Sequence, residues 1–146
     1  MLAAPLHELR VKPAVIIEQV QETFVESMIV TAYTLGADST GKAVGDSGYG
    51  VTASGALGTP GYTIAASPDI PFGTKIFVPG WGTGVVQDRG GAITQGHLDV
   101  LMATEAEAIA WGIRVLDVTI YGPMETISVM PAPITREVFN EQAVLP

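Results

Sequence analysis

Two aspartates stand among apolar residues in the stretch from Thr83 to Leu101, which reads T-G-V-V-Q-D-R-G-G-A-I-T-Q-G-H-L-D-V-L. Asp88 follows one short apolar run and Asp99 lies within another, and a glycine-containing turn separates the two runs. An isolated charge among branched aliphatic side chains is costly, so each carboxylate must be paired, hydrogen-bonded or protonated. Asp88 and Asp99 are therefore the first candidates for chemistry.

The spacing of the two aspartates allows two interpretations. If both runs are strands, the two side chains can reach the same end of a small sheet and share one cleft. Like charges that close raise one pKa, which gives a carboxylic acid that is still protonated near neutral pH. Alternatively, Asp88 is a turn residue that bonds the backbone of the following glycines, and Asp99 is a hydrogen-bonded carboxylate at a strand end.

Short strands and one helix are predicted to position these carboxylates. The 17 glycines and 10 prolines imply many turns, which suits a small closed barrel of six or seven strands. A capping box at Thr104 and Glu107 starts the helix, and Gly112 ends it. The long loop at 35–49 is expected either to bind something or to be a solvated connection. Strands are predicted at 27–33, 50–55, 61–66, 75–79, 84–86, 98–101 and 115–121, with another at 127–129 and either a strand or a short helix from residue 15.

Composition excludes several classes of protein. With 47% hydrophobic and 15% charged residues, the 146-residue chain is globular, and its length suits one core. A net charge of −8 without a basic run argues against nucleic-acid binding. The absence of cysteine excludes disulfides and thiolate zinc sites, and His7 and His97 lie too far apart in sequence to indicate a metal site. No apolar run is long enough to span a membrane.

The segment 31–121 resembles the three-aspartate (3D) domain of bacterial cell-wall proteins, which is related to membrane-bound lytic transglycosylase A and to stationary-phase survival proteins. The matching pieces occur in family order and cover about three-fifths of the chain. They are T-A-Y-T (31–34), V-T-A-S-G (51–55), T-I-A-A-S-P-D-I-P-F-G-T-K-I (63–76), G-V-V-Q-D-R-G-G-A-I (84–93), G-H-L-D-V (96–100), E-A-I-A-W-G (107–112) and V-L-D-V-T-I-Y (115–121). The resemblance implies a mainly β fold, a six-stranded double-psi β-barrel with one short helix and a groove for a glycan strand.

The resemblance also implies roles for individual residues. Asp99 stands at the aspartate of the family's L-D-V motif and is expected to be the catalytic acid/base, with Asp88 as its orienting and pKa-tuning partner. The third family aspartate is displaced here, because Ser67 takes its motif place and Asp69 lies nearby, where it is expected to fill the role from a shifted position. Val51 replaces a frequent family lysine.

The implied reaction is lytic transglycosylation of peptidoglycan, in which a single carboxylate suffices because the C6 hydroxyl of muramic acid is the nucleophile. No cofactor and no metal are required. Thr52, Ser54 and Tyr33 are expected to bond sugar hydroxyls and Trp81 to offer a flat surface to a sugar, although Tyr33 and Trp81 also suit ordinary packing at the barrel rim.

Other functions compete with this one. A related barrel can bind cell-wall glycan without cleaving it, or serve as an accessory domain of a phage tail or lysis assembly. An aspartic protease is disfavoured because Asp88-Arg89-Gly90 lacks the Ser or Thr that normally follows that aspartate.

The expected organisation is an N-terminal extension (1–25), a barrel domain (26–122) and a C-terminal extension (123–146). The extensions are candidate contacts for a protein partner. A cell-wall, periplasmic or extracellular location is expected, with phage association as an alternative. Because residues 1–10 lack a basic segment followed by an apolar one, no signal peptide is predicted, and export would use a leader already removed or another route.

Overall fold

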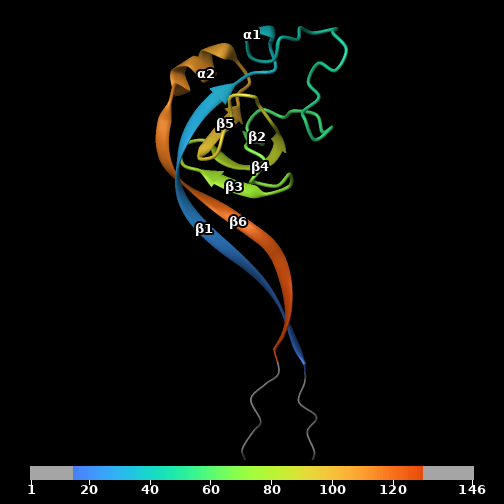
Figure 1. Ribbon diagram of the computed structural model, residues 1–146, viewed down its shortest axis with the longest axis vertical. Helices are drawn as coiled ribbons and strands as arrows, with labels where there is room; N and C mark the ends of the chain where they lie inside the picture. The colour runs from blue at the N-terminus through green and yellow to red at the C-terminus, as the bar shows by residue number, and fades with distance from the viewer. Residues whose placement is uncertain (1–14, 130–146) are drawn as a thin grey trace, which may run out of the picture. The chain divides into compact units, whose positions relative to one another are not determined.

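A computed structural model describes residues 15–129 of the chain. Of the predicted extensions, residues 1–14 of the N-terminal one and residues 130–146 of the C-terminal one lie outside the described residues. The described elements follow one another along the chain (Figure 1). They are β1 (Ile16–Tyr33), α1 (Ala37–Thr40), β2 (Thr63–Ala66), β3 (Lys75–Val78), β4 (Gly82–Asp88), β5 (His97–Leu101), α2 (Glu105–Trp111) and β6 (Arg114–Val129).

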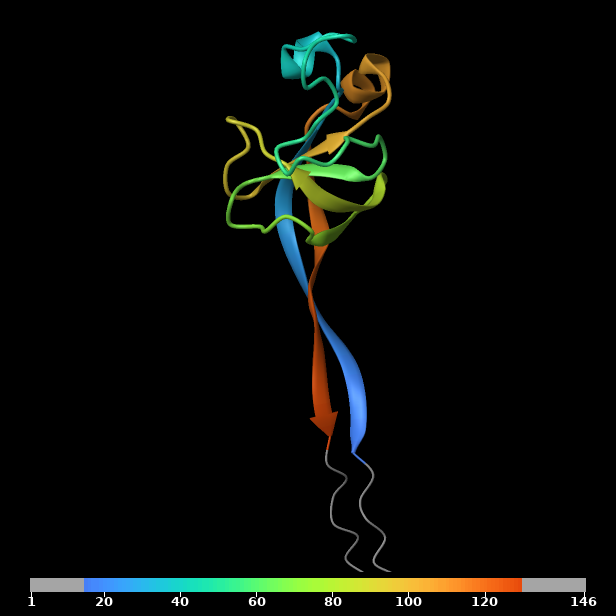
Figure 2. The same cartoon turned by 90° about the vertical axis from the view of Figure 1, so that its right-hand side faces the viewer.

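The six strands form a closed barrel in the order β1-β5-β2-β4-β3-β6. β1 pairs with β5 and β2 with β4 in parallel, whereas β2 with β5, β3 with β4 and β3 with β6 are antiparallel. Both helices lie at the same end of the barrel (Figure 2). The predicted mainly β, six-stranded barrel is confirmed, and the mixed pairing fits a double-psi β-barrel.

Alternation along the strands builds the barrel core. Every second residue of β5, Leu98 and Val100, is fully buried, as are Val30 of β1 and Val86 of β4. This is the pattern of strands with one face on a core. The residues between them, among them Asp99, point to the other face and are free to carry function.

Helix α2 has the predicted start and end. The Thr104 side chain accepts a bond from the Glu107 N–H and the Glu107 carboxylate accepts one from the Thr104 N–H, so the capping box is present. Gly112 is the C-cap, with a positive φ of 65°. Trp111 is buried and its Nε1 donates to the Val30 carbonyl at 3.1 Å, which ties the helix to β1.

Three local predictions differ from the structure, and one open alternative is decided by it. The strand expected at 50–55 is wrong: this segment makes only an isolated bridge between Val51 and Leu57, because Gly55 has a positive φ of 87° and turns the chain back. The loop at 35–49 contains the one-turn helix α1, so the described chain has two helices rather than one. The segment 127–129 is the end of β6 rather than a separate strand. Of the strand and the short helix predicted from residue 15, the strand is correct, because the residues from Ile16 onward belong to β1.

The chain divides into two units. Gln21–Met124 is one compact unit, and the described part of the other consists of residues 15–20 and 125–129. Within the second unit, the Gln19 Nε2 donates to the Thr126 Oγ1 at 2.9 Å. The boundaries predicted after residues 25 and 122 stay a prediction.

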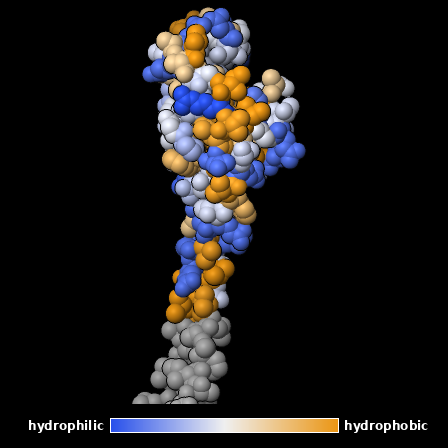
Figure 3. Space-filling model, turned by 90° about the vertical axis from the view of Figure 1, so that its left-hand side faces the viewer, coloured by the Kyte–Doolittle hydropathy of each residue, from blue (hydrophilic) through white to orange (hydrophobic). Residues whose placement is uncertain are grey.

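Apolar and polar side chains are intermixed over the face shown in the space-filling view (Figure 3). In the unit Gln21–Met124, the exposed apolar side chains include Phe24, Val25, Phe72 and Phe77. No helix within residues 15–129 is long and apolar enough to cross a membrane.

Candidate functional site

One row across three neighbouring strands carries both aspartates. Asp99 of β5 is paired with Ala65 of β2, and Ala65 is paired with Asp88 of β4. Residues in register on adjacent strands point to the same face, and adjacent strands lie about 4.8 Å apart. The small Ala65 side chain therefore separates two carboxylates that face the same side of the sheet.

A β-bulge in β4 turns Asp88 to that side. Ile64 is paired with Val86, and both side chains lie in the barrel core. Regular pairing would next place Gln87 opposite Ala65 and Asp88 opposite Ala66, whose side chain also lies in the core. Instead the register shifts after Ile64, so Asp88 is opposite Ala65. The extra residue takes the carboxylate out of the core, which is the re-aiming effect that bulges have beside functional sites.

The two carboxylates line one pocket of about 340 Å³. This volume is within the range of about 300–1,000 Å³ found for small-molecule sites. The segment between β1 and β2, expected either to bind something or to be solvated, forms one wall of the pocket. The lining residues are Tyr33, Leu35, Ser39, Thr40, Lys42, Gly48, Gly50, Val51, Thr52, Ala65, Asp88, Arg89, Gly90, Ile93 and Asp99.

Asp88 is held by three donors. Its Oδ1 accepts bonds from the backbone N–H groups of Ala53 and Arg89, both at 2.9 Å, and its Oδ2 accepts from the Tyr33 hydroxyl at 2.8 Å. All three donate to Asp88, which suits an ionised carboxylate because that group only accepts. The alternative in which Asp88 bonds the following glycines is not what the structure shows, since the bonded N–H groups belong to Ala53 and Arg89.

Asp99 has a different environment. Burial raises the pKa of Asp99, and the negative charge of Asp88 raises it further, against the opposing effects of the Thr31 hydrogen bond and the His97 charge. Its Oδ1 accepts a bond from the Thr31 hydroxyl at 3.0 Å. The pair thus combines a fixed carboxylate with one whose proton is retained to higher pH, which is the division of roles expected of a general acid and its partner.

Tyr33 packs its ring in a small apolar cluster with Ala65, Ile93 and Leu101. Burial raises the pKa of Tyr33 well above its usual range, and the bond to Asp88 adds to this effect. Tyr33 therefore stays protonated and donates a hydrogen bond to Asp88. Its ring packs against apolar residues, as the packing alternative predicted, and its hydroxyl makes a polar contact in the pocket.

The other predicted residues are only partly brought together. Thr52 is buried and lines the pocket, and its hydroxyl lies 3.1 Å from that of Ser54, which is not among the lining residues. Trp81 lies elsewhere, packed against the barrel core and lining a shallow pocket with Trp111.

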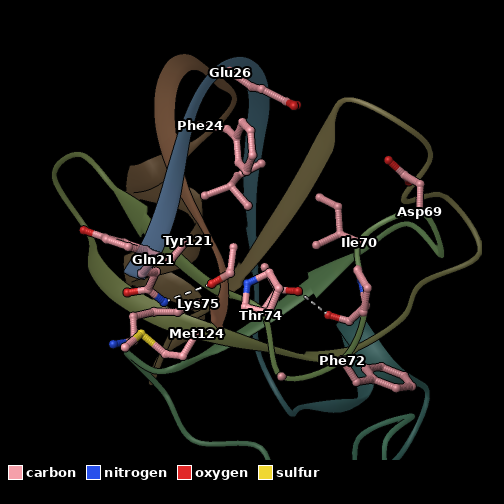
Figure 4. A pocket seen from close by; sticks show the side chains of 15 residues that line it. Gln21, Phe24, Glu26, Asp69, Ile70, Phe72, Thr74, Lys75, Tyr121 and Met124 are labelled. Carbon is pink, nitrogen blue, oxygen red and sulfur yellow. Dashed lines mark hydrogen bonds between the residues drawn. The ribbon is translucent and has the colours of Figure 1, made fainter. Parts of the chain in front are cut away.

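Asp69 lies in a different pocket, of about 720 Å³ (Figure 4). There it is beside Ile70, on the segment before β3, while Gln21 and Lys75 lie on the other side of the pocket. Its carboxylate accepts a hydrogen bond from the Ser67 hydroxyl. The two residues that compete for the third family aspartate are thus bonded to each other, outside the pocket of Asp88 and Asp99.

Sequence reasoning missed Arg89, Lys42 and Thr31. The Arg89 guanidinium donates to the carbonyls of Ala66 and Ile70 and lies 4.0 Å from the centre of the Phe72 ring, so it fixes the chain around Asp88. Lys42 lines the pocket from the long segment. Thr31 had a visible signal, because it is two residues before Tyr33 and therefore on the same face of a strand.

The described residues contain no group of three or more metal-ligating side chains. The fold and this pocket define a class: a closed six-stranded β-barrel with a pair of unequal carboxylates beside one another on its outer face.

Comparison with known proteins gives a family match for part of the barrel. Residues 62–122 match the family model of the 3D domain, so the chain carries a 3D domain, as the sequence motifs predict. Over 58 residues the chain is 36% identical to the cell wall-binding protein YocH of Bacillus subtilis (strain 168). That match covers 39% of this chain and 20% of YocH, so it spans about a fifth of that protein.

Proposed function

We propose that this protein acts on cell-wall peptidoglycan as a lytic transglycosylase. The 3D domain and the similarity to a cell wall-binding protein support a role at peptidoglycan. The observation that carries the enzymatic proposal is the convergence of Asp88 and Asp99, with unequal environments, in one pocket. In this proposal the glycan strand lies over the outer face of β2, β4 and β5.

Asp99 is the acid/base. In its protonated form it donates to the glycosidic oxygen between N-acetylmuramic acid and N-acetylglucosamine, and the bond from C1 to that oxygen breaks. The C6 hydroxyl of the same muramic acid bonds to C1 and gives its proton to the Asp99 carboxylate. The products are a 1,6-anhydro end and a free hydroxyl on the leaving sugar, and Asp99 is again protonated. The intramolecular hydroxyl is already in place, so water is not consumed.

Asp88 acts on Asp99 rather than on the sugar. Its two oxygens are occupied by three donors, whereas among the described residues no bond engages the Oδ2 of Asp99. The Asp88 charge raises the pKa of Asp99 in addition to the effect of burial.

Thr52 and Lys42 are two of the polar side chains that line the pocket and can contact a substrate. The Thr52 hydroxyl donates to the Ala56 carbonyl at 2.8 Å, which leaves its oxygen as an acceptor for a sugar hydroxyl. Tyr33 lines the pocket and acts through its hydrogen bond to Asp88, whereas Ser54 is not among the lining residues and acts through its contact with Thr52.

The test is digestion of purified peptidoglycan followed by mass spectrometry of the soluble fragments. Wild type is expected to release anhydro-muropeptides and Asp99→Asn to release none. Asp117→Asn is the matched control, because Asp117 is exposed on β6 and away from the pocket. Fragments with reducing ends instead would show a hydrolase, in which water is the nucleophile.

A non-catalytic cell-wall-binding module is the second candidate, favoured by the name of the relative YocH. It predicts that wild type and Asp99→Asn bind peptidoglycan equally and that neither releases fragments. Fragment release and binding measured on the same two proteins separate the candidates, because only the binding module has wild-type protein that binds without releasing fragments.

A further inference from the structure

Two consecutive hydrogen bonds connect His97 to Asp99 through the Thr31 hydroxyl. The Thr31 Oγ1 lies 2.7 Å from the Nε2 of His97 and 3.0 Å from the Oδ1 of Asp99. Thr31 is in register with Asp99 across the parallel pair of β1 and β5, and His97 is two residues before Asp99 on β5. The three side chains therefore lie on one face of two adjacent strands.

The single proton of Thr31 sets the direction of these two hydrogen bonds. A hydroxyl has one proton to donate and can accept two bonds. The alternative acceptor, the Leu98 carbonyl, lies 3.4 Å from the Thr31 Oγ1, farther than the 3.0 Å to Asp99. With the Thr31 proton directed to Asp99, the contact with His97 requires that the Nε2 carry a proton and donate to Thr31.

We propose that Thr31 and His97 are positioning residues for the catalytic acid. Thr31 holds the Oδ1 of Asp99, which leaves Oδ2 as the atom that carries the proton into the pocket. His97 keeps the Thr31 hydroxyl pointing toward Asp99 by donating to its oxygen. This inference rests on the proposed function for its catalytic consequence, but its hydrogen-bond geometry does not.

Charged and titratable groups face Asp99 from each neighbouring element. His97 lies on its own strand, Asp88 on β4, Tyr33 on β1, and Lys42 and Arg89 on the segments that line the pocket. Of the groups that act on the Asp99 pKa, burial and Asp88 raise it, and the Thr31 bond and the His97 charge lower it. Removal of either positioning residue therefore raises that pKa.

This upward shift of the Asp99 pKa can be measured, and loss of a residue with a merely structural role would not produce it. The reaction needs protonated Asp99, so the rate falls as pH rises through the Asp99 pKa. Thr31→Val and His97→Gln are each expected to move this basic limb to higher pH. Thr31→Val also lowers the maximal rate by roughly 10- to 100-fold, because the carboxyl is no longer held in one orientation.

The first experiment is the pH profile of anhydro-muropeptide release by wild type, Thr31→Val, Thr31→Ser and His97→Gln. Thr31→Ser keeps the hydroxyl and is expected to retain the wild-type profile. His7→Gln is the control for loss of a histidine. An unchanged basic limb in both Thr31→Val and His97→Gln would overturn the proposal, and His97→Gln decides alone if Thr31→Val does not fold.

The second experiment needs no activity. Nitrogen NMR shifts of the imidazole report which ring nitrogens carry a proton, and His7→Gln assigns the two histidine signals. We expect a proton on the Nε2 of His97 in wild type and in Thr31→Ser, and partial loss of that proton from Nε2 in Thr31→Val. A bare Nε2 in wild type would overturn the hydrogen-bond chain. If wild type releases no fragments but shows this Nε2 proton, the proposed function fails and the geometry stands.

Discussion

Asp88 and Asp99 are chemically identical side chains in unlike surroundings. Asp88 accepts three hydrogen bonds and Asp99 accepts one, from Thr31. The pKa of Asp99 is raised by burial and by the charge of Asp88. Environment rather than residue type therefore divides the proposed roles.

Replacing Asp88 tests this coupling. Asp88→Asn removes the negative charge that raises the Asp99 pKa, so the basic limb of the pH profile is expected to move to lower pH. This shift is opposite to the one expected for His97→Gln. The rate at the optimum should fall by roughly 100-fold, the size expected when a preorganised electrostatic group is lost. A basic limb that moves upward would contradict the assigned effect of Asp88.

Asp99→Asn is expected to stabilise the fold at neutral pH. A carboxyl whose pKa is raised in the folded protein contributes stability below its unfolded value, near 3.8, and this is lost as pH rises through the folded pKa. The amide of Asp99→Asn does not ionise, so the variant does not lose this stability as pH rises. Replacing a residue that serves function at a cost in stability commonly stabilises a protein.

The measurement is Tm at pH 7 and at pH 3 for wild type, Asp99→Asn and the exposed control Asp117→Asn. A rise of a few degrees is expected at pH 7 for Asp99→Asn alone, and no difference at pH 3. Equal Tm values at pH 7 would show that Asp99 carries no cost in the ionised form.

At the scale of elements, the close approach of β4 to the chain before β2 depends on Gly84. A Cβ at Gly84 would lie 2.3 Å from the Tyr62 carbonyl oxygen and 2.6 Å from the Trp81 ring. The Val85 N–H donates to the same carbonyl at 2.8 Å, so the backbones cannot separate without loss of that bond. This contact places β4, and therefore Asp88, beside β2.

Gly84→Ala is accordingly expected to destabilise the protein by about 3 kcal/mol or more, at the upper end of overpacking effects. Gly91→Ala is the matched control, because a Cβ there meets nothing within 4 Å and its φ is not positive. Urea denaturation of both variants measures the difference. Similar urea midpoints for Gly84→Ala and Gly91→Ala would show that the contact between β4 and the chain before β2 can accommodate a Cβ at position 84.

At the scale of the whole molecule, the net charge of −8 acts on any encounter with a cell wall. Walls that retain anionic polymers repel such a chain, and the repulsion is screened as the Debye length falls from about 30 Å at 0.01 M salt to about 8 Å at 0.15 M. Under the proposed function, attraction to the wall therefore comes from the binding pocket rather than from net charge.

Binding to walls with anionic polymers is expected to increase severalfold between these two salt concentrations, and binding to walls stripped of the polymers is expected to stay nearly constant. Sedimentation of the protein with each wall preparation gives the bound fraction. Binding that decreases with salt on intact walls would instead indicate a cationic surface that dominates recognition.

The sequence by itself determined most elements of the barrel. Period-two alternation at 98–101 and the branched residues of 75–78 appear as β5 and β3, and the capping box and Gly112 set the ends of α2. These signals are local, because side-chain alternation and caps depend on residues a few positions apart. The family motifs, which lie in the same elements, predicted the 3D domain for the same reason.

Only the tertiary structure decided the site. The row of Asp99, Ala65 and Asp88 depends on strand register and on a bulge at Gln87, and the sequence does not show which strands are neighbours. The position of Asp69 in another pocket and the bonds from Thr31 and Tyr33 to the two aspartates are likewise contacts between distant segments. Register is fixed by packing of the whole barrel, so the residues of the pair could be named from the sequence, but their partners could not.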